Sequence, residues 1–218
     1  MGIIKAFLDL LYPPRCVLCG KRGRLSEDRL CSACGALKPQ KLYRHYAIRT
    51  EKNAYTLECR APQYYEEPFR GAIRRFKFRG ASGLAEMLAK QMLPVMVTDK
   101  TVDCIVPVPV SAERKAARGY DQSVLLAKEL SELTGIPCRQ LLTKTRHNRT
   151  QHKLSLRERR ENVRGVYKAE NAEGLRILLL DDIVTTGSTA REAAETLYRA
   201  GALWVGCISC AFAGIRNA

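Results

Sequence analysis

Apolar residues along the chain follow two patterns, and the two alternate. Helical spacing occurs at residues 3–12, 66–97 (interrupted at 80–83), 123–134 and 188–200. Continuous apolar runs occur between and after these helices, at residues 102–110, 175–182 and 202–212. Strands that are apolar throughout and alternate with helices are typical of a parallel sheet covered on both faces. The pattern therefore predicts an α/β fold, with ligands bound beyond the carboxyl ends of the strands.

Between residues 139 and 164 the apolar pattern gives way to a polar, basic segment. It carries nine basic residues: Arg139, Lys144, Arg146, Arg149, Lys153, Arg157, Arg159, Arg160 and Arg164. A stretch of this length without a structural pattern, inside a compact domain, usually forms a lid or a binding loop.

Charge and length narrow the function classes. The 218 residues carry a formal net charge of +15, which favours a polyanionic partner, although a basic surface can also serve solubility alone. No run of 18 apolar residues occurs, so a membrane span is excluded. Residues 1–12 contain Lys5 and Asp9 and no cleavage site for an export signal. We expect a cytoplasmic protein, with peripheral attachment to the inner face of the membrane left open.

Four of the nine cysteines form two CxxC pairs, Cys16 with Cys19 and Cys31 with Cys34. Two such pairs at this separation can offer four thiolates to a tetrahedral zinc ion, and a closed site of this kind is structural rather than catalytic. The alternatives are chance spacing or a redox dithiol. Cys207 and Cys210 have the same spacing but lie in an apolar run, which favours core positions. We expect an N-terminal helix and zinc module at residues 1–45 and a larger domain at 46–218.

The densest chemistry lies at the end of the apolar run 175–182. Two carboxylates, Asp181 and Asp182, are followed by a turn and helix start containing Thr185, Thr186, Gly187, Ser188 and Thr189. Backbone N–H groups and hydroxyls at a helix start can hold a phosphate, while carboxylates suit sugar hydroxyls or Mg²⁺. The alternative, a plain capped helix after a strand, accounts for only part of the run.

This run, DDIVTTGST, resembles the signature that binds phosphoribosyl pyrophosphate (PRPP) in type I phosphoribosyltransferases. Together with the four cysteines it is similar to the ComF family of late-competence and GntX-like proteins. RRFKF (74–78), IVPVPV (105–110), RGYDQS (118–123), Gln151-x-x-Leu154 and Arg159-x-x-Asn162-Val163 agree with that family. Tyr120-Asp121 departs from it, since relatives commonly have Phe-Asn there.

The resemblance implies a type I phosphoribosyltransferase fold and assigns roles to named residues. Asp181 and Asp182 would hold the ribose hydroxyls, with Mg²⁺, and residues 185–189 the 5′-phosphate. Arg114 and Arg118 would lie near the pyrophosphate. Residues 151–162, with Gln151, Arg159 and Asn162, would match a loop that closes over the site. Lys77 is a further candidate contact, or else a surface lysine on an amphipathic helix.

Two functions remain open at this stage. One is a PRPP-dependent transferase, in which a nucleophile of unknown identity displaces pyrophosphate from C1 of the ribose. The other is a non-catalytic protein that binds single-stranded DNA during uptake, on the same scaffold. The resemblance also implies a place in natural transformation and a helicase-like translocase as partner. The lack of any aromatic residue between Tyr120 and Tyr167 weighs against base stacking by the basic segment.

Overall fold

The fold is built on a five-stranded sheet, as described by a computed structural model for residues 13–78, 80–96, 101–145 and 165–214. Its strands lie in the order β1-β2-β7-β6-β3. Their bounds are β1 Leu42–Arg49, β2 Ala54–Ala61, β3 Cys104–Pro107, β6 Arg176–Val184 and β7 Trp204–Phe212. Strands β2, β7, β6 and β3 are mutually parallel, and only β1 is antiparallel to its neighbour. The predicted α/β fold with a mostly parallel sheet is confirmed.

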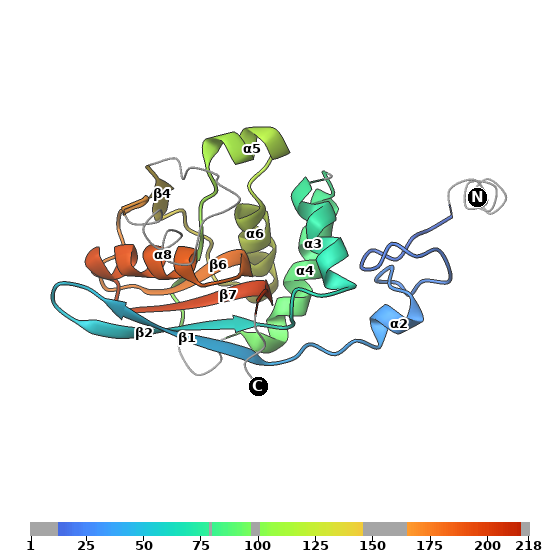
Figure 1. Cartoon of the computed structure of the whole chain (residues 1–218), viewed down its shortest axis with the longest axis horizontal. Coiled ribbons are helices and arrows are strands. Elements are labelled where there is room, and N and C mark those ends of the chain that lie inside the picture. The colour runs from blue at the N-terminus through green and yellow to red at the C-terminus, as the bar shows by residue number, and fades with distance from the viewer. Residues whose placement is uncertain (1–12, 79, 97–100, 146–164, 215–218) are drawn as a thin grey trace.

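Helices cover both faces of this sheet, which explains the continuous apolar runs. Side chains at alternate positions of β6 point to opposite faces. Ile177 and Leu179 pack on the side of α8 (Ser188–Arg199). Leu178 and Leu180 pack on the side of α3 (Phe69–Phe78), α4 (Ala85–Met92) and α6 (Gln122–Thr134). Figure 1 shows these helices on either side of the strands.

Several elements had no counterpart in the apolar pattern. The β1–β2 hairpin, the short helix α5 (Ala112–Arg118) and the two-stranded sheet of β4 (Leu142–Lys144) and β5 (Tyr167–Ala169) were not predicted. Strand β1 is only half covered, and α5 has no buried residue, so neither leaves an apolar signal. The predicted domain boundary after residue 45 falls inside β1, which pairs with β2 along its whole length. The division into residues 1–45 and 46–218 itself stays a prediction.

The cysteine-rich segment lies beside α3 at one end of the molecule and includes the short helix α2 (Ser32–Gly35) (Figure 1). Cys16, Leu18 and Cys34 form a small apolar cluster with Phe69 and Ala72 of α3. Within the described ranges, no helix combines the length and apolar character needed to cross a bilayer. The predicted N-terminal helix 3–12 and the lid candidates Gln151, Arg159 and Asn162 lie outside those ranges.

Candidate functional site

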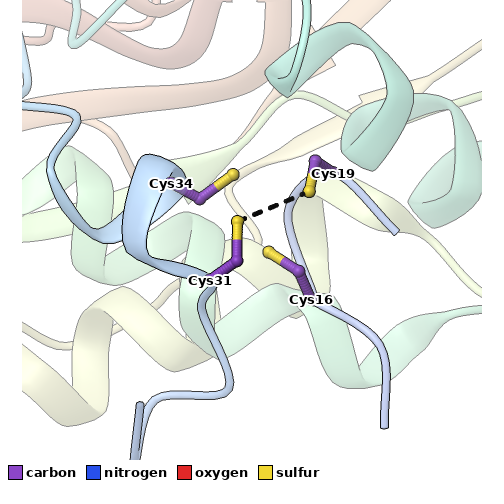
Figure 2. A group of neighbouring side chains, drawn as sticks. All are labelled: Cys16, Cys19, Cys31 and Cys34. Carbon is purple, nitrogen blue, oxygen red and sulfur yellow. Dashed lines mark hydrogen bonds between the residues drawn. The ribbon is translucent and has the colours of Figure 1, made fainter. Parts of the chain in front are cut away.

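The four cysteines of the two CxxC pairs converge on one point (Figure 2). Their sulfur atoms all lie within 4.8 Å of one another, and the Sγ atoms of Cys19 and Cys31 are 3.8 Å apart. In a tetrahedral zinc site with Zn–S bonds of 2.3 Å, sulfur atoms are about 3.8 Å apart. Each pair is closed by a tight turn, in which the N–H of Gly20 donates to Cys16 O and that of Gly35 to Cys31 O. The arrangement fits a structural zinc ion held by all four cysteines.

The backbone around the cluster favours negative charge on sulfur. Burial acts to raise the pKa of Cys16, but hydrogen bonds from the backbone of Cys19, Cys31 and Leu18 outweigh it and lower the pKa to about 6. Burial and the neighbouring sulfurs raise the pKa of Cys34. The cluster thus stabilises one thiolate but disfavours a second one beside it. A bound cation would offset the negative charge of the additional thiolates.

Helix α3 attaches the zinc module to the sheet domain. The guanidinium of Arg75 donates to the carbonyls of Val17, at 2.7 Å, and Leu18, at 2.9 Å. These two residues lie between Cys16 and Cys19, so Arg75 binds the backbone of the first CxxC turn directly. The apolar cluster around Phe69 lies on the same helix.

The two carboxylates that end the apolar run of β6 face a cation from α3. Nζ of Lys77 lies 2.7 Å from Oδ2 of Asp182, and both side chains are largely buried, with 17% and 11% exposed. Lys77 is therefore not a free surface lysine; the structure places it against the candidate ribose site. The N–H of Asp182 donates to Oδ1 of Asp181 at 2.8 Å, which fixes the first carboxylate beside the second.

The environment of Asp181 disfavours its charge. Burial is the main cause, the charge of Asp182 adds to it, and the cation of Lys77 acts the other way. Together they raise the pKa of Asp181 to about 7. Adjacent carboxylates of this kind suit a ligand that brings hydroxyl donors or a divalent cation.

A tight turn follows β6 and opens α8. The hydroxyls of Thr186 and Ser188 lie 2.8 Å apart, and Gly187 caps the helix with a φ of 72°. A small hollow is lined here by Asp181, Ile183, Val184, Thr185, Gly187, Ser188, Thr189 and Ala190. Asp181 therefore lines the same hollow as the hydroxyl residues Thr185, Ser188 and Thr189 at the start of α8, a combination that suits a sugar phosphate.

Two residues of β1 that sequence reasoning missed hold this turn in place. Nη1 of Arg44 donates to the carbonyls of Thr185, at 2.8 Å, and Ala213, at 3.0 Å. The ring of Tyr46 lies directly against Gly187, where an added Cβ would come within 2.3 Å of it. Arg44 and Thr185 are 141 positions apart, and no local pattern connects them.

The loop after β3 is organised by Asp121. Its Oδ1 accepts from the N–H groups of Ser123 and Val124, and its Oδ2 accepts from Val110 N–H at 3.3 Å. Asp121 thus caps α6 and ties the loop to that helix. The neighbouring Tyr120 hydroxyl donates to the carbonyl of Phe76.

Of the two arginines predicted near the pyrophosphate, one is anchored and one is open to solvent. Arg118 donates to Oε1 of Gln122 at 2.6 Å and lies over the ring of Phe78, 5.0 Å from its centroid. Arg114, one turn earlier in α5, is exposed.

The β4–β5 hairpin brings two further titratable groups toward Asp181. Burial lowers the pKa of Lys144, and the charge of Arg114 adds to the effect. Burial raises the pKa of Tyr167, and the charge of Asp181 adds to it. Lys144 and Arg114 are therefore like charges close enough to repel each other, and an anionic ligand would offset this repulsion.

A four-cysteine cluster followed by an α/β domain with a mostly parallel sheet and paired carboxylates at a strand end defines a class of zinc-ribbon proteins. The double zinc ribbon domain family matches residues 7–41. DNA utilization protein YhgH of Salmonella typhi is 31% identical over 217 residues, covering 90% of this chain and 96% of that protein. Competence protein F of Haemophilus influenzae is 29% identical, covering 86% and 92%. The chain belongs to this family of competence and DNA utilization proteins, the ComF family.

Solved structures with partial similarity include that of the allosteric regulatory enzyme of purine biosynthesis, at 29% identity and a TM-score of 0.39, over 59% of this chain and 25% of that one. Glutamine PRPP amidotransferase from B. subtilis, complexed with ADP and GMP, has 25% identity and the same TM-score, over 74% and 35%. Neither TM-score reaches 0.5, so this likeness assigns no function to the site.

Proposed function

We propose that the site at the end of β6 binds PRPP. The observation that carries the proposal is the hollow after β6, which is lined by Asp181 together with Thr185, Ser188 and Thr189 at the start of α8. Asp182 adjoins it through its hydrogen bond to Asp181, and Thr186 through its contact with Ser188. The carboxylates would accept the ribose hydroxyls, and the helix start would donate to the 5′-phosphate. In the ligand-free protein Lys77 supplies the positive charge that Asp182 needs.

Mg²⁺ would be held together with PRPP by Asp181 and Asp182. The chemistry of these donors fits, because hard divalent cations prefer carboxylate oxygens and the two carboxylates of Asp181 and Asp182 are adjacent. When bound, the ion would offset charge that develops on the departing pyrophosphate.

The remaining groups would act by position and charge. Lys144 and Arg114 would bind the pyrophosphate group. The bond between C1 and pyrophosphate would break as the nucleophile forms its bond to C1, and the departing pyrophosphate would need no proton. Residues 146–164 follow β4 directly, so Gln151, Arg159 and Asn162 stay predicted contacts of a closing loop. The acceptor nucleophile is not assigned.

Calorimetric titration with PRPP tests this proposal. We expect micromolar affinity that depends on Mg²⁺ and is abolished in Asp182→Asn. Asp28→Asn is the control, because it removes a carboxylate from an exposed position of the cysteine-rich segment, outside the site, and should leave affinity unchanged. A zinc-loaded protein that fails to bind millimolar PRPP would overturn the proposal.

The relatives' names, DNA utilization protein and competence protein F, support a role in the uptake of DNA during transformation. We expect that a strain lacking this chain transforms poorly and is restored by the parent gene. If the Asp182→Asn variant restored transformation to the parent's level, the role in DNA uptake would not depend on PRPP binding. A helicase-like translocase remains the partner predicted from the family resemblance.

Binding of single-stranded DNA is the second candidate function. The formal charge of +15 and the exposed basic residues of α5, Arg114 and Lys115, favour it. Its signature is affinity for oligonucleotides that falls steeply as salt rises. The triple variant Arg157→Ala, Arg159→Ala, Arg160→Ala tests whether the predicted loop contributes to DNA binding. Unchanged affinity of this variant for oligonucleotides would exclude the loop from the interface.

A further inference from the structure

The end of α3 presents an aromatic ring to solvent. Phe78 is 65% exposed, the highest value among the large apolar side chains of the described residues. The other apolar residues of α3, namely Phe69, Ala72, Ile73 and Phe76, are buried. The helix therefore completes its packing without Phe78, whose ring contributes nothing to the core.

A guanidinium group lies over this ring. The guanidinium of Arg118 lies 5.0 Å from the ring centroid and is held there by its hydrogen bond to Gln122. A hollow beside the ring is lined by Glu67, Gly71, Arg74, Arg75 and Phe78. The charge of Glu67 is offset by Arg70, with 3.1 Å between Oε1 and Nε, while Arg74 is exposed.

We propose that Phe78, with Arg118 and Arg74, is a stacking site for an unpaired base of single-stranded DNA. An exposed aromatic face next to guanidinium groups is the arrangement that holds bases and their phosphates in proteins that bind single strands. A paired base offers no free face to such a ring, so duplex DNA does not satisfy it. The inference rests on the second proposed function and gives it a location.

The location explains how a strand and PRPP could be handled by one chain. Lys77, which contacts Asp182, directly precedes Phe78 in α3. The two side chains leave the helix about 100° apart, so that Lys77 contacts Asp182 while Phe78 faces solvent. The strand would pass at the rim of the PRPP site without entering it.

Fluorescence anisotropy with two labelled 20-mers tests the proposal. One is oligothymidylate, and the other is an abasic strand with the same phosphates. We expect Phe78→Ala to weaken binding of oligothymidylate roughly ten-fold and to leave the abasic strand unaffected. Phe78→Trp should retain affinity. Leu203→Ala, which removes another exposed apolar residue (61% exposed), should bind like the parent.

A spectroscopic signature separates stacking from a structural effect. The parent has one tryptophan, Trp204, so Phe78→Trp adds a reporter at the site itself. Oligothymidylate should quench the added emission, while the abasic strand should not. Equal loss of both strands in Phe78→Ala, or no quenching in Phe78→Trp, would overturn the proposal. Micromolar displacement of the strand by thymidine monophosphate would do so too, since it would indicate a small-molecule site.

PRPP titration of Phe78→Ala keeps the two proposals distinct. Normal Mg²⁺-linked PRPP binding is expected, because the ring faces away from Asp182. If the parent binds oligothymidylate as described but not PRPP, only the PRPP proposal fails. If the parent binds PRPP but not oligothymidylate at low salt, the stacking site fails.

Discussion

Lys77 and Asp182 form an ion pair that joins helix α3 to the end of strand β6, with 2.7 Å between Nζ and Oδ2. The two residues come from different layers of the fold, and their side chains are largely shielded from water. In such surroundings a charge left without its partner is costly. The pair therefore supports the fold and, at the same time, defines the charge that a ligand meets at the site.

Replacing the cation should reveal this double role. We expect Lys77→Met to lower the free energy of unfolding by about 2 kcal/mol, since a hydrogen bond to a charged, shielded group is lost. Urea denaturation measures the effect. Lys90→Met is the control, because Lys90 pairs with Glu86 at an exposed position, where water screens the pair, and its loss should change stability far less. Equal losses in the two variants would contradict the structural importance of Lys77.

Asp181 should make stability depend on pH. Its pKa is about 7 in the folded protein and about 4 in the unfolded chain, so between these values the folded state binds more protons. The free energy of unfolding should therefore fall as pH rises from 4 to 7, by roughly 2–4 kcal/mol. Asp181→Asn should remove this component of the pH dependence. Denaturation curves at pH 5 and pH 8 measure it, and identical pH profiles for parent and variant would refute it.

Loss of zinc should propagate to the ligand site through α3. We expect one zinc per four-cysteine cluster by elemental analysis, and loss of that zinc in Cys31→Ser with a drop in melting temperature. Because Arg75 of α3 binds the first CxxC turn, PRPP affinity should also weaken. Cys138→Ser, outside the cluster, should keep both zinc and affinity. Unchanged PRPP binding in zinc-free protein would show that α3 is held without the module.

Gly187 should tolerate no side chain. In Gly187→Ala the new Cβ would meet the ring of Tyr46, so we expect a loss of about 2 kcal/mol or more in unfolding free energy and loss of PRPP binding. Gly135→Ala is a matched control, with a φ of 74° and open space, and should cost only about 1 kcal/mol. Adding Tyr46→Ala should partly restore Gly187→Ala. Equal losses at both glycines would rule out the contact with Tyr46.

The apolar pattern predicted the elements whose side chains are buried. Leu178 and Leu179 of β6 face opposite covered sides, which is why the run reads as continuous. The pattern could not predict β1, where Tyr43 is 45% exposed, or α5, which buries nothing. In such elements the apolar residues are not concentrated on one buried face, so their spacing does not indicate a helix or strand.

The candidate site, too, contains residues that the sequence could predict and residues that it could not. Asp181, Asp182 and the turn after them are contiguous, so their chemistry could be inferred directly from the sequence. Arg44 and Tyr46 support that turn from a distant strand, and only the folded chain brings them there. Asp121 was identified as a departure from the family, but its capping of α6 depends on the geometry of the loop.

The hydrogen bonds of Arg44 have a consequence for how the site is assembled during synthesis. Its guanidinium needs Thr185 from the turn after β6 and Ala213 from the end of β7. A ribosome makes β1 early, yet this arginine lacks the Ala213 carbonyl until β7 has emerged. A nascent chain that stops before β7 should therefore hold all the signature residues without a formed turn. Ligand binding would then report that synthesis has reached the last strand.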